Sequence, residues 1–162
     1  MRRLLIAIAL LAAASAARAA DSGPVAAPPA DAPPAVVGKP TVTAELRYNE
    51  AEAFAHKQLW ALAESAYDEA TKIKPDFPEA WNGLGHARKM QGKFPEALAA
   101  YREALRLRPD FPQALEYLGE TYVAMGKSDD ARATLAKLKP LDAALADKLA
   151  QAINDGKPAA TW

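Results

Sequence analysis

The residues that could carry out catalytic or metal chemistry are few and widely separated. The chain has no cysteine, and its two histidines, His56 and His86, lie 30 residues apart. Glu116 and Glu120 are one helical turn apart, which could pair two carboxylates for acid-base chemistry but is typical of a solvated helix face. The sequence has no HExxH motif, glycine-rich phosphate loop or recognisable serine nucleophile. We therefore predict a protein that is not an enzyme and has no cofactor, and keep a metal-dependent enzyme using His56, His86 and acidic residues as an alternative.

The elements that must position these residues repeat with a period of 34. Pro75-Asp76-Phe77-Pro78 recurs 34 residues later as Pro109-Asp110-Phe111-Pro112. Repetition at this length is typical of supersecondary units that stack on one another. Pro109 lacks an N–H and ends a helix, whereas Pro78 and Pro112 fit the first turns of the helices that follow. Each unit is therefore predicted to be a helix, a tight turn and a second helix.

The middle unit has aromatic, small and helix-ending residues in a characteristic order: Trp81, Asn82, Gly83, Leu84, Gly85, Gly92, Phe94, Ala97, Tyr101, Ala104 and Pro109. In this pattern it resembles the tetratricopeptide repeat (TPR) family. Trp81 and Leu84 are expected to face the second helix, with small Gly85 letting the two backbones approach. Tyr101 and Ala104 are expected to face the next hairpin. The resemblance implies an all-α fold, a helical-hairpin repeat solenoid, that acts as a non-catalytic protein-interaction scaffold.

The outer units depart from this pattern. The first has Arg47 and Glu50 where the middle unit has Trp81 and Leu84, so its outer helix is expected to be more polar, as suits a terminal repeat. The third breaks register at Pro140, so its second helix is expected to be short. We predict units over 44–77, 78–111 and 112–139 within a domain that spans 44–155.

A capping helix is predicted after the third unit, over 141–154. Leu141, Leu145, Leu149 and Ile153 recur every fourth residue and would form its apolar face. Gly156 is a suitable stop signal. Residues 156–162 are predicted to be a flexible tail, with insertion of Trp162 into a groove as the alternative.

The start of the chain predicts export. Arg2 and Arg3 precede an apolar run, Leu4 to Ala14, that is too short to span a bilayer, and Ala17-Arg18-Ala19 suits a signal peptidase. We expect a signal peptide over 1–19, cleavage after Ala19, a periplasmic or secreted protein, and no stable membrane insertion afterwards. Residues 20–43 hold six of the 13 prolines and predict a disordered Pro/Ala-rich linker. Recognition of its proline pairs by a partner is the alternative.

The charge balance argues against nucleic acid as a partner. Removal of residues 1–19 takes away Arg2, Arg3 and Arg18 and no acid, so 20 basic against 20 acidic residues become 17 against 20. Binding to phosphate backbones needs clustered Lys and Arg. The one tight basic run, Arg102 to Arg108, also contains Glu103 and is typical of a solvated helix face.

The resemblance places a binding surface on the first helix of each unit, and helical spacing puts the same residues on one face. This predicted peptide-binding set is Glu45, Tyr48, Asn49, Glu52, His56, Glu79, Asn82, His86, Lys89, Gln113, Glu116, Tyr117 and Glu120. Its five glutamates against one lysine predict a basic or polar peptide or protein partner.

One branch of the family clamps acidic tails with lysine and arginine. Here those places hold Gln113, Tyr117 and Gly83, so that activity is not supported. A structural homo-oligomer formed through the terminal helices remains the other non-catalytic alternative, and the sequence does not decide the oligomeric state.

Overall fold

The computed structural model describes residues 41–158, which form seven helices and no strand. In order, they are α1 (Ala44–His56), α2 (Trp60–Ile73), α3 (Pro78–Met90), α4 (Phe94–Leu107), α5 (Pro112–Ala124), α6 (Ser128–Leu138) and α7 (Ala143–Asp155). The predicted signal peptide, all of the linker but 41–43, and Trp162 lie outside the described residues. No helix within 41–158 is long and apolar enough to cross a membrane.

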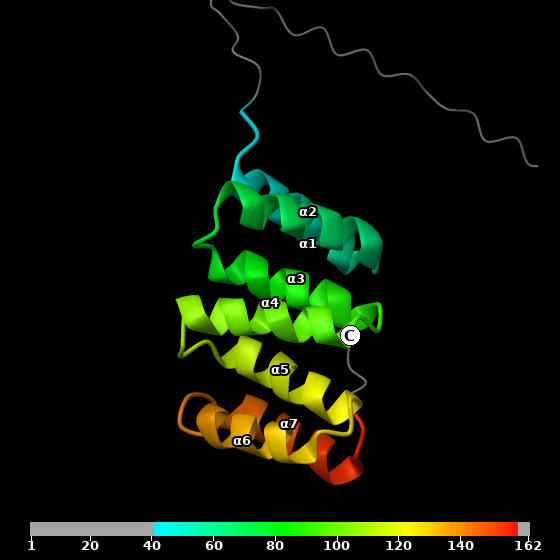
Figure 1. Cartoon of the computed structure of the whole chain (residues 1–162), viewed down its shortest axis with the longest axis vertical. Coiled ribbons are helices and arrows are strands. Elements are labelled where there is room, and N and C mark those ends of the chain that lie inside the picture. Colours follow the sequence, from blue (N-terminus) through cyan, green and yellow to red (C-terminus); the bar gives the residue numbers. More distant parts are fainter. Residues whose placement is uncertain (1–40, 159–162) are drawn as a thin grey trace, which may run out of the picture. The chain divides into compact units, whose positions relative to one another are not determined.

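The helices form three antiparallel hairpins, α1–α2, α3–α4 and α5–α6, stacked in sequence order (Figure 1). Each second helix also packs on the first helix of the next hairpin, and α1, α3 and α5 contact one another in turn. This arrangement confirms the predicted all-α hairpin repeat fold. It places the first helices of the three hairpins side by side.

Local sequence explains where the helices begin and end. The Thr43 side chain accepts a hydrogen bond from the Leu46 amide at 3.1 Å and so caps α1. Pro78 and Pro112 are the first residues of α3 and α5. The second helices α2 and α4 both end two residues before a proline, at Ile73 and Leu107, as predicted.

The third unit has the short second helix that was predicted, and a cap helix follows it. α6 has 11 residues against 14 in α2 and α4, so it is short as predicted. The cap helix α7 begins at Ala143 rather than at 141, because the Asp142 side chain accepts a hydrogen bond from the Leu145 amide at 2.9 Å. Leu141 therefore lies in the preceding turn and is exposed. Leu149 is fully buried, as predicted from the apolar residues that recur at every fourth position.

Small residues on the first helices let neighbouring helices pack closely. A Cβ atom on Gly85 would lie 2.6 Å from the Tyr101 ring on α4, and one on Gly119 would lie 2.4 Å from Leu149 on α7. Tyr101 also reaches the next hairpin, where its ring centroid lies 6.1 Å from that of Tyr117. The predicted close approach at Gly85 is therefore confirmed.

Trp81, which was expected to face the second helix of its hairpin, is not a buried core residue. Its side chain is only partly buried, with its indole N–H donating to the Pro75 carbonyl at 2.8 Å. It packs between the cluster around Leu84 and the cluster of Ala104, Phe111 and Ala114. Leu84, which is fully buried, packs instead in a cluster with Ala51, Ala63 and Tyr67 of the first hairpin.

Gly85→Leu should destabilise the domain strongly, because the Tyr101 ring occupies the space that any side chain would need. We expect the free energy of unfolding to fall by about 1–3 kcal/mol, the usual cost of overpacking a core. Denaturant melts followed by far-UV circular dichroism measure it. Ala99→Leu also introduces a leucine, at an exposed position of α4, and should change stability by about 0.5 kcal/mol or less. Equal stabilities would refute the close approach.

Candidate functional site

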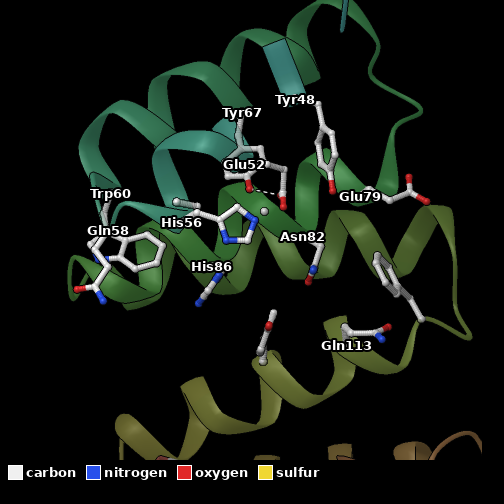
Figure 2. A pocket seen from close by; sticks show the side chains of 14 residues that line it. Tyr48, Glu52, His56, Gln58, Trp60, Tyr67, Glu79, Asn82, His86 and Gln113 are labelled. Atoms are coloured by element: carbon white, nitrogen blue, oxygen red, sulfur yellow. Dashed lines mark hydrogen bonds between the residues drawn. The ribbon is translucent and has the colours of Figure 1, made fainter. Parts of the chain in front are cut away.

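A hollow of about 470 Å³ opens beside α1, α3 and α5 (Figure 2). It is lined by side chains from these helices and from the adjoining turns and second helix: Tyr48, Glu52, Ala55, His56, Gln58, Trp60, Tyr67, Glu79, Asn82, Gly83, His86, Phe111, Gln113 and Tyr117. Five of these residues are tyrosine, tryptophan or phenylalanine, two are histidine, and none is lysine or arginine. The surface therefore combines broad apolar contact area with amide and carboxylate groups.

Eight residues of the predicted peptide-binding set line this hollow: Tyr48, Glu52, His56, Glu79, Asn82, His86, Gln113 and Tyr117. The structure thus brings together one face from each of three successive units. His56 and His86, which are distant in sequence, lie in the same wall. Whether these residues bind a ligand stays a prediction.

The other five residues of the set lie outside the hollow. Glu45 and Asn49 are exposed on α1, and Glu45 is paired with Lys74 at 3.2 Å. Lys89, Glu116 and Glu120 are buried, with 6%, 6% and 4% of their surfaces exposed. The expectation that these three charges face a ligand is therefore corrected.

Lys89 and Glu120 form a buried ion pair that joins α3 to α5. Burial lowers the pKa of Lys89, an effect that the charge of Glu120 opposes. Burial, reinforced by the charge of Glu120, raises the pKa of Glu116. Because the ammonium also lies 5.2 Å from the centre of the Tyr117 ring, this pair holds one wall of the hollow in place.

Six lining residues were not predicted: Ala55, Gln58, Trp60, Tyr67, Gly83 and Phe111. Most lie in turns or on α2. The predicted set was drawn only from one face of the first helices of the hairpins, α1, α3 and α5, which we call the inner helices. A signal for Gln58 was present, because it lies one period before Gly92 and two before Gly126. All three have positive φ, at 56°, 74° and 71°. Only the first unit has a side chain in this left-handed conformation, which usually costs about 1–2 kcal/mol, and that side chain lines the hollow.

The polar groups of the hollow are held by specific partners. The Tyr67 hydroxyl donates a hydrogen bond to Glu52, and burial together with Glu52 raises the pKa of Tyr48 to about 12. Both tyrosines are therefore neutral hydrogen-bonding groups at physiological pH. Burial opposes ionisation of Glu79, yet hydrogen bonding to Arg108 holds the pKa of Glu79 below its ordinary value. Glu52, in contrast, forms no ion pair with a lysine or arginine among the described residues.

Asn82 occupies the middle of the surface, pointing from α3 into the space toward α5, where Gln113 lies (Figure 2). Its Oδ1 atom is buried and accepts no hydrogen bond from any of residues 41–158. A buried acceptor without a donor costs about 1–3 kcal/mol. A ligand N–H would remove that cost.

His86 is packed into an aromatic wall. Its ring stacks on Tyr117 with centroids 4.8 Å apart and 16° between the planes, and meets the edge of Trp60 at 5.3 Å. Burial, with a smaller contribution from the charge of Lys89, lowers the pKa of His86 to about 4. At neutral pH this histidine is therefore an uncharged part of the wall.

Nothing among the described residues gathers His86 and His56 into a metal site. No group of three or more His, Asp and Glu side chains in residues 41–158 is arranged to hold a metal ion. The chemistry that the hollow supports is hydrogen bonding and apolar contact with a ligand.

Stability should fall as the pH drops from about 6.5 to about 4, in part because of His86. In that window the unfolded chain binds a proton at this histidine that the folded chain does not, so protonation favours unfolding. We expect His86→Gln to lessen this pH-dependent loss by about 1–3 kcal/mol. Denaturant melts across the window measure it, with His56→Gln at an exposed position of α1 as control. Parallel curves for wild type and His86→Gln would contradict the neutral, buried state.

The profile of the TPR repeat matches residues 90–126. None of the curated proteins matches the chain. Among solved structures, the first TPR of Spaghetti (RPAP3) bound to the HSP90 peptide SRMEEVD has a TM-score of 0.66 at 16% identity, over 70% of this chain and 91% of that one. The TPR domain of Arabidopsis OM64 has a TM-score of 0.67 at 16% identity, over 70% and 95%.

A third solved structure, the TPR2B domain of yeast Sti1 in its pHsp70 complex, is 25% identical, with a TM-score of 0.62 over 70% of this chain and 91% of that one. These likenesses agree with the repeat period, the hairpin geometry and the small residues at the helix contacts. Domains of this fold are typically non-catalytic scaffolds.

Proposed function

The chain carries TPR repeat sequence and folds as a TPR domain, and from this premise we propose that its hollow binds a peptide segment of a partner protein. The observation that carries the proposal is Asn82, whose buried amide oxygen lacks a donor at the centre of an aromatic surface built by three successive units. An extended peptide offers a backbone N–H to such an oxygen, and the flanking tyrosines offer flat amphipathic contacts. The similar domains of RPAP3 and Sti1 are in complexes with an HSP90 peptide and pHsp70, which supports this class of ligand.

We propose further that the peptide is neutral or basic rather than acidic. The HSP90 peptide on the RPAP3 domain, SRMEEVD, is rich in acidic residues. Here the lining has no lysine or arginine, and Gly83, Gln113 and Tyr117 stand at the three places considered for a carboxylate clamp. Glu52 would favour a cation, whereas Glu79 is already paired with Arg108.

Asn82→Ala should weaken the binding of a cognate peptide at least about tenfold, because it removes the central acceptor. The probe is a peptide selected from a random library on the domain and titrated calorimetrically. Asn49→Ala is the matched control, since Asn49 is an asparagine on an inner helix that lies outside the hollow. Equal losses in both variants, selection of peptides like SRMEEVD, or no selectable peptide at all would refute the proposal.

We also propose that the protein works outside the cytoplasm, as the first 19 residues suggest. The expected mature chain begins at Ala20. Intact mass of the protein recovered from its own cells tests this. A mass that still includes Met1 to Ala19 would contradict it.

A further inference from the structure

The first hairpin has an open end face, and the α1 part of this face is buried at the corresponding positions of α3. Leu46, Glu50 and Ala53 are spaced along one face of α1. One period later the same positions are Ala80, Leu84 and Ala87, which are 0%, 0% and 1% exposed because α3 packs there on the preceding hairpin. The end face, defined here as Leu46, Glu50, Ala53, Leu62, Glu69 and Ile73, has no preceding hairpin among the described residues. The α1 positions of this face are those that in α3 contact another helical layer.

This end face is more apolar than was predicted from Arg47 and Glu50. Leu46, Leu62 and Ile73 are 43%, 50% and 47% exposed. Leu62 and Ile73 lie on one face of α2 together with Glu69, and an Arg47–Glu69 contact of 2.8 Å joins that face to α1. Where the first unit has Leu62, the next two units have Glu96 and Asp130. A solvated terminal repeat has no need of leucine at this position.

The opposite end of the repeat stack is already covered. α7 packs on both α5 and α6, with Leu149 fully buried against Gly119. Head-to-tail stacking of copies, in which the end face of one meets an open third hairpin of the next, is therefore blocked. Within residues 41–158 the α1–α2 end face is the open end of the stack, so copies that pair end to end do so through like faces.

Charge also suits a second copy. Arg47 lies between Glu50, at 2.6 Å, and Glu69, at 2.8 Å, so the row across the end face alternates in sign. A two-fold axis that passes between Arg47 and Glu69 would bring Arg47 of each copy onto Glu69 of the other. Two adjacent helices of 13 and 14 residues cover about 20 Å by 20 Å, so two faces together bury on the order of 800 Å². This is a small interface, typical of weak association.

We infer that two copies of this chain pair through their α1–α2 end faces, forming a two-fold dimer of about micromolar affinity. The two hollows lie on the inner helices outside this contact. The inference is thus independent of peptide binding, and either could fail alone.

The test is sedimentation of the chain from Ala20 onward, at about 1 to 200 μM. We expect the mass to rise toward that of a dimer, and the double variant Leu46→Glu, Leu62→Glu to weaken association at least about tenfold. Both positions are exposed, so helical circular dichroism and the melting midpoint should stay near wild type. Leu141→Glu, equally exposed before α7, is the matched control and should leave association unchanged.

A second measurement locates the contact. Because the chain has no cysteine, Ala53→Cys on the end face and Ala136→Cys on α6 each provide a single thiol. A bismaleimide should link two copies through Ala53→Cys much faster than through Ala136→Cys. A monomer at every concentration, association that survives the double glutamate variant, or equal linking at both thiols would overturn the inference.

Discussion

Close packing at small residues is the constraint on which the whole domain depends. The Tyr101 ring packs directly on Gly85, and the Leu149 side chain packs directly on Gly119. Ala80 and Ala87 are buried where α3 lies on the first hairpin. Each hairpin buries only part of its apolar surface by itself and needs its neighbour for the rest. A side chain added at one of these points therefore disturbs the orientation of two packed helices, and with it the alignment of α1, α3 and α5.

The hollow is a consequence of this stacking rather than a separate structure. Since α1, α3 and α5 must lie side by side, the residues on their shared face form one continuous wall. The buried Lys89–Glu120 pair joins two of these helices, and Tyr117 is packed between that pair and His86. Charges that looked available for a ligand thus support the wall, and the wall itself presents neutral aromatic and amide groups. This makes the surface better suited to an apolar or amide-bearing segment than its glutamate content suggests.

The two ends of the stack differ in whether the outward face of the terminal hairpin is covered by another helix. At one end α7 covers the third hairpin with an apolar face. At the other, α1 and α2 leave leucines and an isoleucine open to solvent, crossed by an ion-paired row. The asymmetry leaves the domain with one candidate contact surface at its end and another along its inner helices.

The sequence by itself determined the fold and the ends of α2 and α4 before their prolines, because these depend on local chemistry: proline placement, small residues and a 34-residue period. It also placed eight of the 14 lining residues, since residues three or four apart on a helix share a face. Only the tertiary structure decided that Lys89, Glu116 and Glu120 are buried, that Trp81 lies between two clusters, and that Gln58, Trp60 and Phe111 join the hollow. The reason is that burial and ion pairing depend on how neighbouring hairpins are rotated against one another, and helical period alone does not specify that rotation.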